Sequence, residues 1–168
     1  TRIRLGKGMI AKLADHVAAD ARILILYGGS SAEKNGTLAE VRAALAGREV
    51  QEFGGIEPNP TYETLMRAVQ IIRREKLDFL LAVGGGSVID GTKFVAAAVG
   101  HEGDAWDILT TRGACVTGAL PFGTVLTLSA TGPEMNSFSV ITRSQTREKL
   151  AFGSPPVFPR FSVLDPTT

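Results

Sequence analysis

Short apolar runs alternate along the chain with longer segments in which apolar residues recur every three or four positions. A short apolar run that ends at glycine or a polar turn is typical of a strand, and the longer spacing is typical of an amphipathic helix. We therefore predict strands at residues 1–6, 22–27, 48–54 and 78–84. The spacing predicts helices at residues 9–19, 37–46 and 61–76, and a further helix from the glycines at 84–86 to about residue 99.

Two local patterns refine these elements. Ile3 and Leu5 alternate with arginines, which predicts that the first strand is half-buried. Thr61 stands three residues before Thr64 at the start of the third helix and resembles a capping box. The segment before it, residues 54–60, contains two prolines and is expected to be a loop.

Strands without alternation, separated by helices, indicate a parallel sheet that is covered on both faces. The predicted fold class is therefore α/β, an open, doubly wound, mostly parallel, Rossmann-like sheet with helices on both faces. The last third differs from the rest. Phe138–Thr142 and Glu148–Phe152 flank a polar turn and predict a β-hairpin, and Arg160–Asp165 predicts a closing strand.

Composition narrows the possible partners. The 168 residues fit one domain, and 44% hydrophobic and 21% charged residues are ordinary for a globular protein. A net charge of +1 with scattered arginine and lysine argues against binding nucleic acid or an anionic membrane surface. No apolar run is long enough to span a bilayer, and a single cysteine, Cys115, is compatible with the reducing cytoplasm.

Three loops at the expected carboxyl ends of strands carry candidate chemistry, because ligands of open α/β sheets bind there. They are Gly28-Gly29-Ser30-Ser31, Gly84-Gly85-Gly86-Ser87 and the threonine-rich run from Thr127 to Ser137. Glycines before a helix allow backbone N–H groups to approach a phosphate, and the helix N-terminus adds positive potential. The second loop matches neither the dinucleotide fingerprint nor a P-loop, and a plain tight turn is the alternative reading.

Other polar residues have ordinary alternatives as well. Asp90 and Lys93 share a helix face, either as an intrahelical ion pair or with Asp90 placed to reach a substrate or ribose hydroxyl. The threonine-rich run is equally well a capping segment. His16 and His101 stand alone, which argues against a metal site within this chain.

The stretches EFGGIEPNPTYETL, GGGSVIDGTKFVAAA and LTLSATGPEMN together resemble the N-terminal half of the iron-containing (group III) alcohol dehydrogenases. The nearest branch is that of the NADPH-dependent aldehyde reductases and butanol dehydrogenases. The resemblance implies that residues 1–168 form a dinucleotide-binding domain. It also implies a helical domain after residue 168, absent from this chain, that binds a divalent metal such as iron or zinc through an aspartate and three histidines. Small aldehydes or alcohols as substrates, and a homodimer, follow from the same resemblance.

The family's motifs assign roles to particular positions. The resemblance implies that the pyrophosphate is held by Gly85, Gly86 and Ser87, and that Asp90 lies near the nicotinamide. It further implies that Asn59 lines the cofactor cleft, that Thr127 and Thr131 contact the adenine and ribose side, and that Lys149 reaches the nicotinamide ribose.

The first glycine loop bears on the choice of cofactor. NAD-dependent family members carry an aspartate after this strand, and here that position is Gly28. Without a carboxylate there is no repulsion of a 2′-phosphate, and Gly29, Ser30 and Ser31 can donate to it, so we expect NADP(H). Pro133 departs from the family pattern and deletes a backbone donor in the threonine-rich loop.

The leading hypothesis is the cofactor-binding half of an NADP(H)-dependent, metal-dependent alcohol dehydrogenase or aldehyde reductase. These residues alone are expected to bind NADP(H) weakly and to turn over no substrate. Two alternatives stay open: an NAD enzyme domain like that of glycerol dehydrogenase or dehydroquinate synthase, which share the glycine motif, and a non-catalytic nucleotide-binding module.

Overall fold

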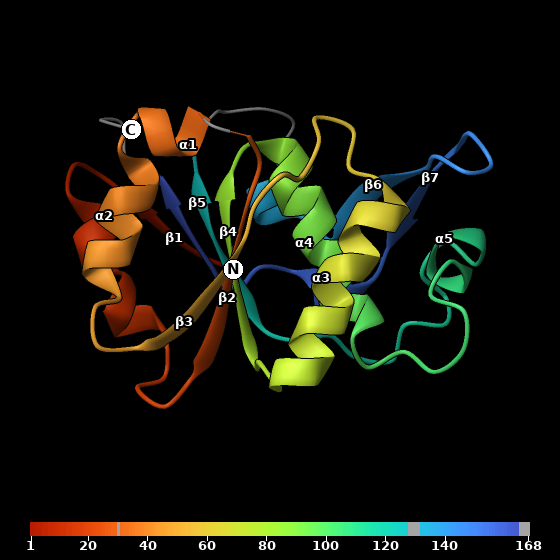
Figure 1. Cartoon of the computed structure of the whole chain (residues 1–168), viewed down its shortest axis with the longest axis horizontal. Helices are drawn as coiled ribbons and strands as arrows, with labels where there is room; N and C mark the ends of the chain where they lie inside the picture. Colours follow the sequence, from red (N-terminus) through yellow and green to blue (C-terminus); the bar gives the residue numbers. More distant parts are fainter. Residues whose placement is uncertain (30, 128–131, 165–168) are drawn as a thin grey trace.

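The computed structural model describes residues 1–29, 31–127 and 132–164. Its main feature is a six-stranded sheet with the order β1-β8-β5-β4-β2-β3, in which every neighbouring pair is parallel (Figure 1). The strands are β1 (Arg2–Leu5), β2 (Arg22–Tyr27), β3 (Glu49–Phe53), β4 (Phe79–Gly84), β5 (Phe122–Leu126) and β8 (Phe161–Leu164). The predicted open, doubly wound parallel sheet is confirmed.

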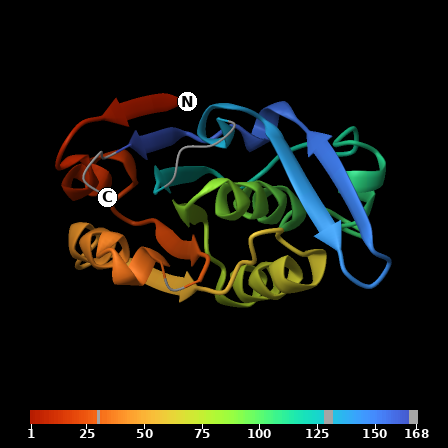
Figure 2. The same ribbon diagram turned by 90° about the horizontal axis from the view of Figure 1, so that it is seen from above.

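Helices cover both faces of this sheet, as the unalternating strands require. The helical segments of the described residues are η1 (Met9–His16), α1 (Ser31–Lys34), α2 (Thr37–Ala44), α3 (Tyr62–Glu75), α4 (Gly86–Ala98) and α5 (Asp107–Thr110), with short 3₁₀ turns η2 (Pro133–Met135) and η3 (Pro155–Val157). Figure 2 shows η1 and α2 on one side of the sheet and α3 and α4 on the other. Thr61 caps α3 by accepting a hydrogen bond from the Thr64 N–H (3.3 Å), as the sequence indicated.

The central strands feed two separate cores. Leu80 and Ala82 of β4 pack with α3 and α4, whereas Leu81 and Val83 pack with η1 and α2. All four side chains are fully buried. Both faces of β4 therefore lie in apolar surroundings, which is why its sequence shows no alternation.

The predicted hairpin is also present. Strands β6 (Phe138–Arg143) and β7 (Glu148–Gly153) pair antiparallel and lie beside α4, away from the main sheet (Figure 2). Arg143 of β6 stacks over the rings of Tyr62 and Trp106, at 5.0 and 5.3 Å from their centroids. Trp106 is buried and packs its loop onto the core.

Two elements near the N-terminus differ from the prediction. The prediction that β1 is half-buried was wrong: all four residues are exposed, with Ile3 41% and Leu5 71% accessible. β1 is the edge strand of the sheet and pairs only with β8. The alternation of apolar and charged residues in its sequence therefore does not mean that one face of the strand is covered. The predicted helix 9–19 is a 3₁₀-helix of eight residues that buries Ile10 and Leu13. A spacing of three residues suits the three-per-turn geometry of that helix.

The strand order creates a switch point. From β2 the chain passes to β3 on one side, and from β3 it crosses through α3 to β4 on the other side of β2. The connections that leave the carboxyl ends of β2 and β4 therefore run in opposite directions. In an open α/β sheet this is where a ligand-binding crevice forms.

Candidate cofactor-binding site

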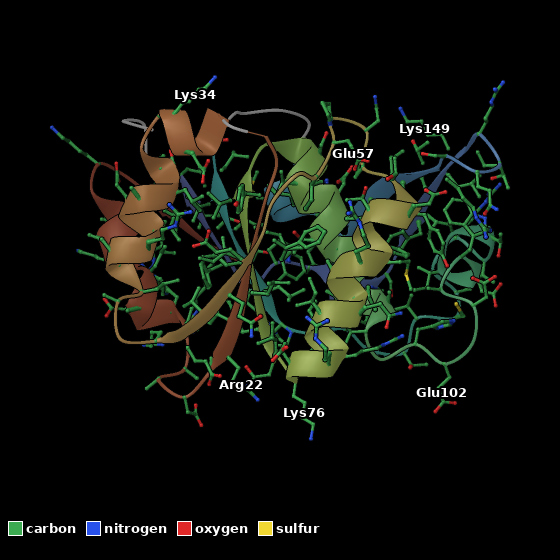
Figure 3. All side chains as sticks on the ribbon, viewed as in Figure 1. Arg22, Lys34, Glu57, Lys76, Glu102 and Lys149 are labelled. Carbon is green, nitrogen blue, oxygen red and sulfur yellow. The ribbon has the colours of Figure 1, made fainter. Side chains whose placement is uncertain are left out.

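A cleft of about 570 Å³ lies at this switch point. It is bounded by the loop after β2, the loop after β3 and the first turn of α4. Figure 3 places Glu57, one of its lining residues, at the upper edge of the molecule, opposite Arg22 and Lys76. The lining residues are Gly28, Gly29, Gly55, Ile56, Glu57, Pro58, Gly85, Gly86, Ser87 and Val88. The predicted glycines of two separate loops are thus brought together in one cleft.

The N-terminus of α4 opens into this cleft. Gly85 is the N-cap residue and provides no side-chain cap, and the first turn carries no acidic residue. The first N–H groups of a helix have no partner within it, and the helix dipole makes this end positive. Because α4 is 13 residues long and its cap is bare, the cleft presents backbone donors suited to an anion.

Glycine is required where β4 meets α4. Gly84 has φ of +158°, and a Cβ there would lie 2.7 Å from Cγ2 of Val88. Its carbonyl accepts the N–H of Thr127 at 3.0 Å, which ties the end of β5 to the end of β4. The predicted site residue Thr127 therefore borders the glycine turn, half-buried at the carboxyl edge of the sheet.

The loop after β3 forms the opposite wall and is held by backbone bonds. The N–H of Gly55 donates to the Gly28 carbonyl at 2.8 Å, and the hydroxyl of Ser87 donates to the carbonyl of Pro58. Ser87 was expected to offer its hydroxyl to a phosphate. In this arrangement the hydroxyl instead joins the two walls, and Ser87 keeps only its backbone N–H for an anion.

Asn59 and Lys149 meet at the rim of the cleft. The Lys149 ammonium donates to Oδ1 of Asn59 at 3.4 Å, across 90 residues of sequence. Figure 3 shows Lys149 projecting from the hairpin at the same edge as Glu57. Two residues assigned from distant parts of the sequence therefore lie together, and Asn59 directly follows Pro58 of the cleft lining.

Glu57 is a cleft residue that sequence reasoning missed. Its Oε2 accepts the hydroxyls of Thr61 and Thr64 at 2.9 and 2.8 Å. Burial by itself raises the pKa of the Glu57 carboxyl, but hydrogen bonds from its own N–H and from both threonines prevail and lower it. Glu57 thus stays ionised and braces the turn that carries Asn59. The sequence signal that could have indicated Glu57 is the pair Thr61 and Thr64 at the start of the following helix, because both hydroxyls donate to it.

Asp90 lies under the hairpin on the next turn of α4. Its Oδ2 accepts the N–H of Val140 at 3.3 Å, and its carbonyl accepts the hydroxyl of Ser139 at 2.7 Å. Burial raises the pKa of the Asp90 carboxyl to about 6, against the opposing effects of the Val140 N–H and the positive charge of Lys93. A carboxyl that titrates near neutral pH beside a cleft is typical of functional sites.

Lys93 is fully buried, and its partners come from the chain that enters the hairpin. The ammonium donates to Oδ1 of Asn136 at 2.8 Å and to the carbonyl of Phe138 at 2.9 Å. The positive charge of Lys93 also acts on Asp90, its neighbour on the same helix face, and lowers the pKa of that carboxyl. Asn136 was not singled out from the sequence, since nothing local marks a partner 43 residues away.

The remaining assigned residues are only partly described. Ser31 is the first residue of α1. Ser30 and Thr131 lie outside the described residues.

A larger hollow of about 940 Å³ lies at the opposite edge of the sheet. It is lined by residues at the amino ends of β1, β4 and β8, with four prolines and three phenylalanines among them. Strand amino ends carry no ligand in open α/β sheets, where binding occurs at the carboxyl ends. The smaller, glycine-lined cleft is therefore the candidate site.

Replacing Asp90 by asparagine is expected to stabilise the protein at neutral pH. The raised pKa means that ionised Asp90 costs free energy in the folded state above about pH 6. Asp90→Asn should therefore raise the free energy of unfolding at pH 7.5 by roughly 1 kcal/mol, a discounted share because some solvent contact remains. The gain in stability should shrink as pH falls through 6 and vanish near 4, where the carboxyl of the unfolded chain is protonated too.

Denaturant unfolding from pH 4 to 8 measures this gain, with Asp20→Asn at an exposed position as the control. A loss of stability at pH 7.5 contradicts the assignment.

A family comparison agrees with this geometry. The model of the iron-containing alcohol dehydrogenases matches residues 1–166. The chain belongs to the iron-containing alcohol dehydrogenase family. The fold, the glycine-lined cleft and the family match thus agree with the resemblance seen in the sequence.

Individual relatives of the family are close to this chain. The NADPH-dependent aldehyde reductase YqhD of Escherichia coli (strain K12) is 56% identical over 168 residues, which are 99% of this chain and 43% of that protein. A probable NADH-dependent butanol dehydrogenase of Bacillus subtilis (strain 168) is 49% identical, again over 99% of this chain and 43% of the relative. The chain therefore spans less than half the length of these relatives.

Solved structures of the family share the fold. The crystal structure of the Escherichia coli K-12 protein YqhD superimposes with a TM-score of 0.97 at 56% identity, covering 99% of this chain and 43% of that one. The NADH-dependent butanol dehydrogenase A of Thermotoga maritima gives a TM-score of 0.94 at 41% identity, covering 99% and 42%.

The family name implies a bound metal. The described part of this chain provides no set of metal ligands. No three histidine, cysteine, aspartate or glutamate side chains cluster there to hold an ion. The described residues therefore do not fit a metal, and we derive no chemical step through one. Within the same residues, no helix combines the length and the apolar character needed to cross a membrane.

Proposed function

We propose that this chain is the cofactor-binding part of an NADP(H)-dependent, metal-dependent aldehyde reductase or alcohol dehydrogenase. The observation that carries the proposal is the glycine-lined cleft between β2 and β4, which has backbone donors on one wall and no carboxylate at position 28. Similar relatives include an NADPH-dependent and several NADH-dependent enzymes, so the preference for NADP rests on Gly28 rather than on their names.

Each wall of the cleft has a role in this proposal. The first-turn N–H groups of Gly86 and Ser87 bind the pyrophosphate, since they face the cleft without a side-chain cap. Gly28 and Gly29 leave room for the 2′-phosphate. Lys149, placed by Asn59 at 3.4 Å, donates to the ribose at the nicotinamide side, and Asp90 lies near that end. The bound nicotinamide supplies the hydride that interconverts aldehyde and alcohol.

Further parts of the proposal concern the metal, the adenosine side of the cofactor, the substrate and the assembly. The divalent metal, iron or zinc, comes from the portion of the relatives that this chain does not span. Thr127 and Thr131 serve the adenosine side of the cofactor. The substrate is a small aldehyde or alcohol, the enzyme is a cytoplasmic homodimer, and nucleic acid and membranes take no part.

Titration of the 168-residue chain with NADPH and NADH tests the proposal. Cofactor fluorescence should show saturable binding of NADPH, with a dissociation constant at least about tenfold lower than that of NADH, which is roughly 1.4 kcal/mol. The affinity should be modest and no aldehyde should be reduced, because these residues offer one wall of the site. Tighter binding of NADH refutes the NADP assignment. No binding of either cofactor refutes the site.

A further inference from the structure

The hairpin is bound to α4 by polar contacts from two residues of one helix face. Asp90 accepts from Ser139 and from the N–H of Val140, one turn nearer the cleft than Lys93. Lys93 donates to the residues just before and at the start of β6. Both α4 residues therefore hold the same strand, and they hold its first half.

Lys93 makes the more demanding of these contacts. Its side chain is 0% exposed, and a buried ammonium is costly unless hydrogen bonds compensate it. Oδ1 of Asn136 accepts both from Lys93 and from the N–H of Phe138 (3.1 Å), while the Phe138 carbonyl accepts from Lys93. One ammonium thus fixes the turn that starts β6.

The strand that Lys93 holds also determines where Lys149 lies. Thr142 of β6 is paired with Lys149 of β7, and the Thr142 N–H donates to the carbonyl of Pro60 at 3.0 Å. Next to Pro60, Asn59 accepts from Lys149. A displacement of β6 from α4 would therefore move Lys149 away from the rim of the cleft.

We propose that Lys93 is a positioning residue of the cofactor site: its buried ammonium locks the hairpin onto α4 and so holds Lys149 at the cleft. The inference rests on the proposed function for its ligand, but the locked hairpin can be measured without any ligand. Lys93 itself does not line the cleft. It acts through Asn136, Phe138 and the hairpin.

Charges around Asp90 provide a second readout, which reports whether the Lys93 ammonium lies beside the carboxyl. Lys93 on α4 lowers the pKa of the Asp90 carboxyl. From the hairpin, Ser139 and the Val140 N–H contact Asp90, and the cations of that element are Arg143, Arg147 and Lys149. Removal of the Lys93 charge should therefore move the titration of Asp90 to higher pH.

The test compares Lys93→Met with the unaltered chain. We expect NADPH to bind about tenfold more weakly, as for the loss of one charge-assisted hydrogen bond. Amide hydrogen exchange in residues 138–143 should be at least about tenfold faster without ligand. The pH at which the Val140 amide loses protection should rise, measured against the unaltered chain at matched pH.

Thr92→Val is the matched control. Thr92 is equally buried on α4, and its hydroxyl donates within the helix, to the Val88 carbonyl. It should leave affinity, exchange and pH dependence unchanged. If Lys93→Met does not fold, Asn136→Ala removes one partner of the ammonium and should give a smaller loosening of residues 138–143.

The outcomes separate the two proposals. The positioning role is overturned if Lys93→Met leaves amide exchange in residues 138–143 and the pH dependence of Val140 protection unchanged. If Lys93→Met does not fold, unchanged exchange in Asn136→Ala overturns it. Equal effects of Thr92→Val overturn it as well. Failure of the unaltered chain to bind NADPH counts against the proposed function, while hairpin exchange still decides whether Lys93 locks the hairpin.

Discussion

Gly28→Asp is expected to reverse the cofactor preference, weakening NADPH binding by about a hundredfold or more while NADH binding is kept or improved. A carboxylate at the end of β2 would repel the 2′-phosphate and accept the 2′-hydroxyl of NADH. Two opposite or like unit charges about 4 Å apart near a protein surface interact by about 4 kcal/mol, which is ample for this change. The same fluorescence titration measures both constants.

The added side chain requires a small shift of its surroundings. A Cβ at Gly28 would lie 3.2 Å from the Ile56 carbonyl oxygen and 3.4 Å from Cγ2 of Val88, so the carbonyl must move by a few tenths of an ångström. Gly28→Ala is the matched control, because it adds the same Cβ without the charge. The account is contradicted if alanine weakens NADPH as much as aspartate, or if aspartate leaves the preference unchanged.

Gly123→Val is expected to destabilise the fold by about 3 kcal/mol or more. A Cβ at Gly123 would lie 2.2 Å from Cζ of Phe161, on the neighbouring strand. Phe161 is buried and stacks on Phe79 at 6.1 Å, so its ring has little room to move. Overpacking of a rigid core typically costs about 1–3 kcal/mol and occasionally more. Displacement of a buried aromatic ring is expected to lie at or above the upper end of this range.

Denaturant unfolding measures this loss. Gly118→Ala is the control, since nothing lies within 4 Å of a Cβ there, and it should change stability by less than about 0.5 kcal/mol. Phe161→Leu added to Gly123→Val should restore part of the loss. Equal stability of Gly123→Val and Gly118→Ala would show that the ring does not fill this space.

The same glycine explains why one strand was not assigned from the sequence. β5 has a glycine at its second position, which weakens a strand pattern, and the reason lies in Phe161, 38 residues further along. By contrast, β2 and β4 were predicted at their full extent because each is a continuous apolar run buried on both faces. A strand that is buried along its whole length shows as an apolar run in the sequence. A contact between residues far apart in the sequence leaves no such pattern.

Site residues divide in the same way. The glycines at 28–29 and 85–86 were found because a strand, a glycine turn and a helix lie together in the sequence, and the topology then joins the two loops in one cleft. Glu57 and Asn136 were missed. The Glu57 carboxylate accepts hydrogen bonds from two threonine hydroxyls, and the Asn136 amide oxygen accepts one from the buried Lys93 ammonium. Neither arrangement follows from a recognisable spacing of residues in the sequence.

A crystal structure of the chain with NADP⁺ tests the central claim most directly. The account predicts the pyrophosphate against the first-turn N–H groups of Gly86 and Ser87, and the 2′-phosphate beside Gly28 and Gly29. A nucleotide bound elsewhere, for example in the larger hollow at the amino ends of the strands, or one whose 2′-phosphate points away from Gly28, would contradict it.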